Sequence, residues 1–248
     1  MKFTVITGAS SGIGYETALA FATKGKNLIL VARRLDKLEE LKKQIHSINQ
    51  SLEVILKGYD LSNRDQVYSL YADLKSYDIE TWINNAGLGD SDLIINEDLQ
   101  KIENMLRVNI DAVTILSTLY AQDYADAEQA QLINVSSAMG YMLAVGNIVY
   151  SATKYYVSAY TEGLAKELSG HALKAKVLAP AITETEFIDK ANNVENFDYS
   201  TGVKKYHTAK EMAQFLIELY ESNNTVGIVN ENYDFVLNDG IYPVLQGL

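Results

Sequence analysis

The stretch Phe3-Thr4-Val5-Ile6-Thr7-Gly8-Ala9-Ser10-Ser11-Gly12-Ile13-Gly14 joins a short apolar, β-branched run to a loop with three glycines. Residues 3–7 are typical of a buried parallel strand, and residues 15–23 continue with a helical pattern. Glycines let a loop turn tightly and approach a ligand closely. The start of a helix offers free N–H groups and a positive dipole end to a phosphate. The stretch therefore favours a strand, a phosphate-binding loop and a helix, with a plain strand-to-helix turn as the alternative.

Strands and helices alternate along the rest of the chain. The pattern predicts a Rossmann-type α/β fold, with a doubly wound parallel sheet in a single domain. Residues of about 183–207 are polar, acidic and without regular pattern, and their length suggests a mobile loop over a site. Further strands are expected at residues 27–32, 52–56, 130–136, 174–180 and 234–237, with a strand and turn at residues 82–87. Further helices are expected at residues 35–48, 105–120, 150–168 and 208–220.

The second expected strand ends in Ala32-Arg33-Arg34. In folds that bind NAD, an acidic residue at this place bonds the ribose 2′-hydroxyl. Guanidinium groups instead favour a 2′-phosphate, which arginine binds with two parallel hydrogen bonds. Arg33 and Arg34 therefore favour NADP(H) over NAD(H), unless both only cap a surface loop.

Tyr150 and Lys154 are four residues apart on an expected helix and share one face of it. A free tyrosine has a pKa of about 10, and a fixed cation beside it favours the phenolate and lowers that value. The pair could therefore exchange a proton with an alcohol or carbonyl oxygen. Tyrosine is abundant in the chain, with 17 residues, so the pair alone is also compatible with a half-buried phenol and a solvated lysine.

Two other polar residues have a functional and a structural interpretation. Asp60 could accept a hydrogen bond from an adenine amino group or cap the helix that begins near Asn63. Asn109 lies within the expected helix at residues 105–120, and asparagine is a mediocre helix former. Its presence there suggests either a functional role or a local bend.

Composition excludes several classes of protein. The chain has 248 residues, of which 48% are apolar, and no apolar run is long enough to cross a membrane. A strand pattern that starts at the first residues suggests a cytoplasmic protein without a signal peptide. The net charge of −11 argues against binding to nucleic acid or to an anionic membrane. Cysteine is absent, and His46, His171 and His207 lack metal-ligand spacing, so no metal site is expected.

Taken together, the chain resembles the short-chain dehydrogenase/reductase family, in its single-domain branch of about this length. The resemblance covers nearly the whole chain, and the order and separation of its motifs make it specific. The residues that carry it are Thr7 to Gly14, Asp60, Asn84-Asn85-Ala86-Gly87, Asn109, Ser137, Tyr150-x-x-x-Lys154 and Pro180.

The resemblance implies a role for each matched residue. Tyr150 would be the general acid/base, and Lys154 would bond the nicotinamide ribose and lower the pKa of Tyr150. Ser137, thirteen positions before the tyrosine as in the family, would hold the substrate oxygen. Asn109 would anchor a water that leads to Lys154. Besides Tyr150 and Lys154, the implied cofactor-binding residues are Gly8, Ser10, Ser11, Gly12, Ile13, Gly14, Arg33, Arg34, Asp60, Leu61, Asn85, Ala86, Gly87, Pro180, Ile182 and Thr185.

The chain departs from the family at two points. Pro180 is followed by Ala181 where a glycine is usual, so the local loop is expected to differ. Ser11 stands where many members that prefer NADP have a basic residue, which leaves Arg33, with Arg34 behind it, as the main support for NADP(H). The substrate is expected to be a small carbonyl or alcohol compound. Besides Ser137 and Tyr150, the expected pocket residues are Ala138, Met139, Tyr141, Met142, Leu143, Ile182 and Phe187.

An NADP(H)-dependent oxidoreductase is therefore the leading hypothesis. The alternative is a binding protein of the same fold that senses NADP(H) without catalysis, although it would not need Asn109, Ser137, Tyr150 and Lys154 together. A nucleotide-sugar epimerase normally needs a longer substrate domain. Relatives commonly pair through the helix that bears the tyrosine and lysine, so a homodimer or homotetramer is expected. The apolar tail at residues 241–248 could pack against a neighbouring subunit.

Overall fold

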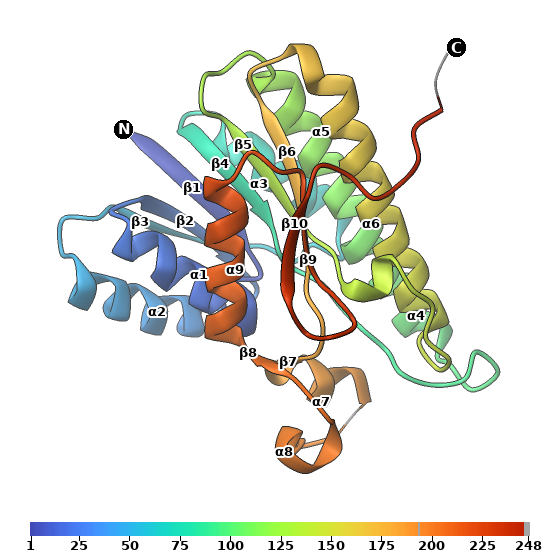
Figure 1. The fold of residues 1–248 in the computed structure, drawn as a ribbon. Helices are drawn as coiled ribbons and strands as arrows, with labels where there is room; N and C mark the ends of the chain where they lie inside the picture. Colours follow the sequence, from blue (N-terminus) through green and yellow to red (C-terminus); the bar gives the residue numbers. More distant parts are fainter. Residues whose placement is uncertain (193, 246–248) are drawn as a thin grey trace.

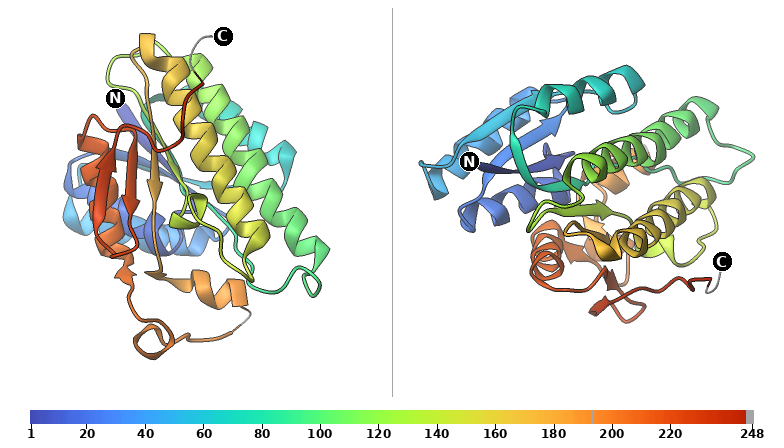
Figure 2. Two further views of the ribbon diagram at one scale, coloured as in Figure 1. Left: turned by 45° about the vertical axis from the view of Figure 1, so that its right-hand side comes forward. Right: turned by 90° about the horizontal axis from the view of Figure 1, so that it is seen from above.

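The computed structural model describes residues 1–192 and 194–245. A central sheet of eight strands runs through the molecule, and helices cover both of its faces (Figures 1 and 2). The strand order is β10-β9-β6-β5-β4-β1-β2-β3, and seven neighbouring strands are parallel. The strands are β1 (Lys2–Thr7), β2 (Asn27–Ala32), β3 (Val54–Gly58), β4 (Asp78–Asn84), β5 (Gln131–Val135), β6 (Lys174–Ala179), β9 (Val226–Val229) and β10 (Phe235–Asn238).

The helices divide into two layers, each with its own core. Apolar side chains of α1 (Gly12–Thr23), α2 (Leu35–Ile48) and α9 (Ala209–Glu221) pack on one face of the sheet. On the other face, α3 (Arg64–Leu74) and α5 (Val113–Tyr124) pack around the buried Trp82, and α6 (Ile148–Glu167) lies beside them (Figure 2). Both faces of the strands are covered, which explains why β1 and β2 are almost continuously apolar.

The predicted single-domain, doubly wound α/β fold is confirmed, with two differences in the sheet. Strand β10 is antiparallel to β9, so the sheet is mostly rather than wholly parallel. Strand β9 was not predicted, because Val226-Gly227-Ile228-Val229 is only four residues long and contains a glycine. The predicted strand at residues 234–237 corresponds to β10.

The predicted helix at residues 105–120 is interrupted. It consists of α4 (Leu99–Leu106), a π-helical segment (Arg107–Ala112) and α5. Asn109 lies in the π-helical segment, where the wider turn gives its side chain partners outside the helix. The local irregularity suspected from Asn109 is therefore present.

The segment predicted to lack regular structure contains four short elements. They are β7 (Thr183–Glu184), α7 (Glu186–Asn192), α8 (Tyr199–Gly202) and β8 (His207–Thr208). Parallel pairing of β7 with β8 brings the two ends of the segment together. Such short elements leave little periodicity in the sequence, so the prediction of an irregular loop was wrong, while its mobility remains a prediction. Among the described residues, no helix has the length and apolar character needed to span a membrane.

Candidate active site

A large cavity, with a volume of about 760 Å³, lies beyond the carboxyl ends of the parallel strands. The chain crosses to the opposite side of β1 between β3 and β4, so the strand order reverses at β1 and β4. Side chains from the ends of β1, β2, β4, β5 and β6 reach the cavity, and α7 covers it. In open α/β sheets, ligands bind at such a reversal point.

The loop after β1 forms one wall of the cavity through its glycines. Gly8 and Gly12 have φ angles of +68° and +58°, which residues other than glycine rarely adopt. A Cβ at Gly8 would lie 2.8 Å from Cα of Ala86, and one at Gly12 would lie 2.9 Å from Cγ2 of Thr185. The bare backbone at the start of α1 therefore fits a pyrophosphate group, as the sequence predicts.

Asn85 fixes this loop from behind. Its Nδ2 donates a hydrogen bond to the carbonyl oxygen of Thr7 at 2.9 Å, and its backbone N–H donates to Oγ1 of Thr7 at 3.0 Å. Gly14 packs against the same amide, since a Cβ there would lie 2.4 Å from Nδ2 of Asn85. Gly14 does not line the cavity, so its predicted role in cofactor contact is replaced by one in loop packing.

Arg34 contacts the phosphate loop directly. Its Nη2 donates hydrogen bonds to Oγ of Ser10 at 3.2 Å and of Ser11 at 3.0 Å. Arg33 lies exposed on the same rim of the cavity. The expected order of importance is thus reversed, because Arg34 rather than Arg33 lies against the loop. Two serines and two guanidinium groups form a site that fits a ribose 2′-phosphate.

Asp60 lies on the cavity wall near the arginines, at the end of β3. Its Oδ1 accepts hydrogen bonds from the backbone N–H and the hydroxyl of Ser62, at 3.0 and 2.8 Å. The cap of α3 is Asn63, whose side chain accepts from the N–H groups of Asp65 and Gln66. Of the two interpretations of Asp60, the structure therefore disfavours the helix cap and leaves the adenine contact open.

Tyr150 and Lys154 lie at the opposite end of the cavity, on α6. Nζ of Lys154 is 5.6 Å from the centre of the Tyr150 ring and donates a hydrogen bond to the carbonyl oxygen of Val135 at 3.0 Å. Burial lowers the pKa of Lys154 to about 8. Burial also raises the pKa of Tyr150 to about 12, and a hydrogen bond with Ser137 acts in the opposite direction. The expected lowering of the Tyr150 pKa is therefore not met, because desolvation of the phenolate dominates.

Ser137 lies at the end of β5, beside Tyr150. Its hydroxyl accepts a hydrogen bond from the N–H of Met139 at 3.1 Å and donates a long one, of 3.4 Å, to the carbonyl oxygen of Pro180. The first contact fixes the hydroxyl at the start of a short 3₁₀ turn. The serine, the tyrosine and the lysine all face one cavity, as predicted.

Asn109 acts behind the cavity rather than in its wall. Its Nδ2 donates to the carbonyl oxygen of Leu88 at 2.8 Å and to Oγ1 of Thr153 at 3.0 Å, and its Oδ1 accepts from the N–H of Leu88 at 2.9 Å. Oγ1 of Thr153 in turn donates to the carbonyl oxygen of Tyr150 at 2.8 Å. Asn109 therefore ties the cavity loop at Leu88 to the first turns of α6, and its amide has no hydrogen left for a water.

Around Tyr150, the wall of the cavity is apolar. Ala138, Met139, Met142, Ile182 and Phe187 line it, as predicted. The Phe187 ring lies across that of Tyr150, with their centroids 5.5 Å apart. The prediction missed several apolar residues of the wall, although Leu88 directly follows the Asn85-Ala86-Gly87 motif and was within reach. The missed residues include Leu88, Val108, Ile188 and Ala191.

Two predicted substrate residues lie outside the cavity wall. Tyr141 donates a hydrogen bond of 2.6 Å from its hydroxyl to Oε1 of Glu162, and its ring stacks on that of Tyr242. Leu143 is 79% exposed. Glu162 also accepts hydrogen bonds from the N–H groups of Ile241 and Tyr242, so it anchors the C-terminal segment on α6. Of the apolar tail, residues 246–248 lie outside the described part of the chain.

A family model described as short chain dehydrogenase matches residues 2–196. An uncharacterised oxidoreductase of Staphylococcus saprophyticus is 30% identical over 244 residues, which are 96% of this chain and 90% of the relative. An NADP-dependent 3-hydroxy acid dehydrogenase of Schizosaccharomyces pombe is 32% identical over 75% of this chain and 73% of its own. The chain therefore belongs to the short-chain dehydrogenase family, a family of oxidoreductases that use nicotinamide cofactors.

Solved structures agree with this assignment. A short-chain dehydrogenase from Sphingobium yanoikuyae in complex with NADPH superposes with a TM-score of 0.85 at 27% identity, over 92% of this chain and 87% of its own. A bulky-bulky ketone specific alcohol dehydrogenase from Comamonas testosteroni gives a TM-score of 0.81 at 26% identity, over 92% and 86% of the two chains.

Proposed function

We propose that this protein is an NADP(H)-dependent oxidoreductase that interconverts an apolar carbonyl compound and its alcohol. One observation carries the proposal. A single cavity joins Ser10, Ser11, Arg33 and Arg34 at one end to a second group of polar side chains at the other. That second group consists of Ser137, Tyr150 and Lys154.

The cofactor, when bound, supplies or accepts the hydride. The chain supplies the site that orients the reactants. Ser137 donates a hydrogen bond to the substrate oxygen, and Tyr150 gives that oxygen a proton during reduction or takes the proton during oxidation. A pKa of about 12 keeps Tyr150 protonated near neutral pH, which suits its role as the acid in reduction.

Lys154, whose Nζ is 5.6 Å from the centre of the Tyr150 ring, supports the acid/base role of Tyr150. Its pKa of about 8 leaves a substantial charged fraction near neutral pH, and its Nζ has donors left beside the one used by Val135. Those donors are available to the nicotinamide ribose hydroxyls. Charge on Lys154 stabilises the phenolate that forms when Tyr150 releases its proton.

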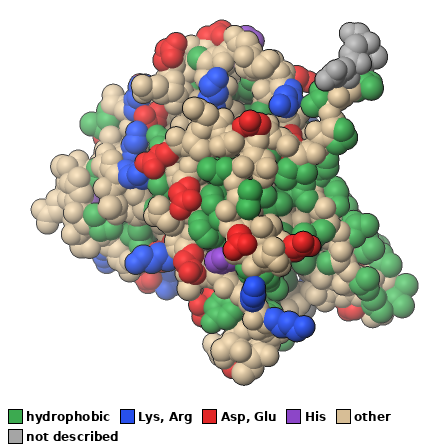
Figure 3. Space-filling model, in the orientation of Figure 1, with side chains coloured by type: hydrophobic (Ala, Val, Ile, Leu, Met, Phe, Trp, Pro, Cys, Tyr) green, Lys and Arg blue, Asp and Glu red, His purple; other side chains and the backbone are tan. Residues whose placement is uncertain are grey.

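The wall around Tyr150 favours an apolar substrate. Met139, Met142 and Phe187 surround the reactive end of the cavity. Exposed hydrophobic side chains also gather over residues 93–99 and 143–148 (Figure 3), which are close in sequence to the cavity residues Ser91, Met142 and Asn147. Ile95 is 83% exposed and Val145 is 89% exposed. An apolar substrate would gain free energy by covering such surface, at about 25 cal/mol per Å².

Titration of the purified protein with NADPH and NADH, read by cofactor fluorescence, tests the cofactor, and a panel of apolar ketones and aldehydes tests the reaction. The proposal predicts tighter binding of NADPH and turnover of the apolar ketones. Binding of NADPH without turnover of any compound would favour the alternative, a sensor of NADP(H). Binding of neither cofactor would refute both.

We also propose that the protein forms a homodimer or homotetramer through α6, as the family resemblance implies. Tyr156 on this helix is 37% exposed and stacks on Tyr160. Light scattering measures the mass in solution, and a strictly monomeric mass would refute this.

A further inference from the structure

An ion pair joins α7, which covers the cavity, to Arg34, which follows β2 and contacts the phosphate loop. Nη2 of Arg34 lies 3.1 Å from Oε2 of Glu186, the first residue of α7, although the two residues are far apart in the sequence. Both side chains line the cavity. Glu186 is therefore the place where α7 contacts the end of the cavity that fits the 2′-phosphate.

The same nitrogen of Arg34 serves three partners. Nη2 lies within hydrogen-bond distance of Oγ of Ser10, Oγ of Ser11 and Oε2 of Glu186, so its two hydrogens are shared among three acceptors. Under the proposed function, a 2′-phosphate with about two negative charges would bind at this guanidinium. The Glu186 carboxylate and such a phosphate would then repel each other and compete for one donor. Both cannot hold Arg34 in the arrangement seen here.

Lys190 keeps Glu186 paired in either case. It lies one turn further along α7, and its Nζ donates a hydrogen bond of 2.5 Å to Oε2 of Glu186. Lys190 is also the largest cause of the lowered pKa of Glu186, ahead of Arg34. Release from Arg34 would therefore leave Glu186 charged but not unpaired, which keeps the cost of that release small.

We propose that Glu186 is a specificity-determining residue that competes with the cofactor 2′-phosphate for Arg34. While it holds Arg34, it also latches α7 over the cavity. This inference rests on the proposed function, since it requires a cofactor at the phosphate loop.

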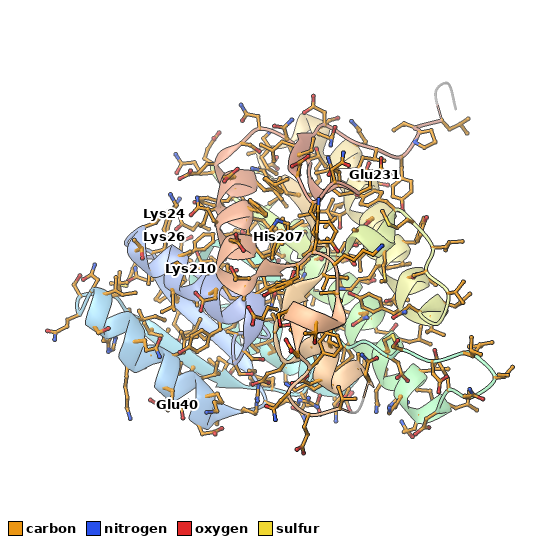
Figure 4. The ribbon with its side chains drawn as sticks, turned by 60° about the horizontal axis from the view of Figure 1, so that its bottom comes forward. Lys24, Lys26, Glu40, His207, Lys210 and Glu231 are labelled. Atoms are coloured by element: carbon orange, nitrogen blue, oxygen red, sulfur yellow. The ribbon has the colours of Figure 1, made fainter. Side chains whose placement is uncertain are left out.

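Other contacts of the segment connect Glu186 to the rest of the site. Its base is closed by β7 and β8, where Thr183 pairs with His207, just before the N-terminal end of α9 (Figure 4). Inside it, the hydroxyl of Tyr199 donates to the carbonyl oxygen of Thr185 at 2.9 Å. Phe187, next to Glu186, packs on the ring of Tyr150. The latch therefore lies one residue from the contact with the catalytic tyrosine.

Glu186→Gln tests the competition, because it removes the charge and keeps the shape. Glu184→Gln is the matched control, because it removes the same charge two residues away. Glu184 is exposed and does not line the cavity. Fluorescence titrations should show about two- to fivefold tighter NADPH binding in Glu186→Gln, the range expected for an exposed ion pair. NADH affinity should stay within about twofold, and the difference should shrink at high salt.

Hydrogen exchange tests the latch itself. Adenosine 2′,5′-bisphosphate carries the competing phosphate but lacks the nicotinamide half, and 5′-AMP is the control ligand. In the unmodified protein, the bisphosphate should speed amide exchange in α7, whereas 5′-AMP should not. In Glu186→Gln, exchange in α7 should be fast from the start and should not respond.

Two results would overturn the inference. An unchanged ratio of NADPH to NADH affinity in Glu186→Gln would refute the competition while leaving the proposed function standing. Failure of the unmodified protein to bind either cofactor would refute the proposed function and this inference with it.

Discussion

Replacement of Gly14 by alanine should destabilise the protein, although alanine is the better helix former. Gly14 lies in the first turn of α1, and a Cβ there would lie 2.4 Å from Nδ2 of Asn85 and 2.6 Å from the carbonyl oxygen of Gly8. The backbone of Gly8 has no room to move, so the Asn85 amide must give way. That amide donates hydrogen bonds to the carbonyl oxygens of Thr7 and Gly8, at 2.9 and 3.3 Å.

The size of the effect follows from opposing contributions. Losing one or two of these hydrogen bonds costs about 1 kcal/mol each, and overpacking a tight site costs about 1–3 kcal/mol. The higher helix propensity of alanine stabilises the folded state by about 1 kcal/mol. The free energy of unfolding should therefore fall by about 1–4 kcal/mol, with overpacking as the largest contribution.

Urea denaturation, followed by the fluorescence of Trp82, measures this change. Trp82 is the single tryptophan and is fully buried, so its emission reports on the core. Gly163→Ala is the matched control, because Gly163 is an exposed glycine within α6 whose Cβ would meet nothing within 4 Å. It should raise the free energy of unfolding by about 0.5–1 kcal/mol. A Gly14→Ala protein as stable as the unmodified one, or a change of the same sign in both variants, would refute the reasoning.

Two further predictions concern residues that support the site. Burial lowers the pKa of Lys154 from 10.5 to about 8, so between these values the unfolded chain binds more protons and the free energy of unfolding rises with pH. At about 1.4 kcal/mol per pKa unit, Lys154 contributes up to about 3 kcal/mol to that rise. Lys154→Met should show a smaller rise between about pH 8 and 10.5 in urea denaturation, and an equal rise would contradict the burial argument. Asn109→Ala leaves the N–H and carbonyl groups of Leu88 without their partner. It should lower the free energy of unfolding by about 2–4 kcal/mol, and an unchanged thermal midpoint would show that Asn109 does not hold this loop.

The sequence predicted those parts of the fold and site that depend on local pattern. The apolar run before Gly8 and the alternation of strands and helices were sufficient for the sheet, because a strand covered on both faces must be apolar. The pairing of Tyr150 with Lys154 was also predicted from local pattern, because residues four apart on a helix share a face.

What the sequence did not predict depends on contacts between distant segments. Tyr141 is adjacent in sequence to pocket residues, yet its hydroxyl turns to Glu162 and its ring to Tyr242. Nothing in the local pattern reports a contact with the C-terminal segment. The pairing of Arg34 with Glu186 was likewise missed, because no spacing rule links an arginine after β2 to a carboxylate on α7.

The pKa of Tyr150 could not be predicted from the sequence either. Spacing indicates that a lysine is near the phenol, which favours a lowered value, but it does not report burial. In the folded protein, desolvation raises the pKa to about 12. In the direction of reduction, the chemistry proposed for Tyr150 therefore begins from the protonated phenol.

The most direct test of the proposed function is the turnover of Tyr150→Phe compared with its affinity for NADPH. Phenylalanine keeps the ring that packs on Phe187 and removes only the hydroxyl that would exchange the proton. The account predicts an NADPH affinity close to that of the unmodified protein and a loss of turnover of about 10²–10⁴-fold, the usual contribution of a general acid/base. Turnover within a few-fold of the unmodified protein would show that Tyr150 is not the acid/base.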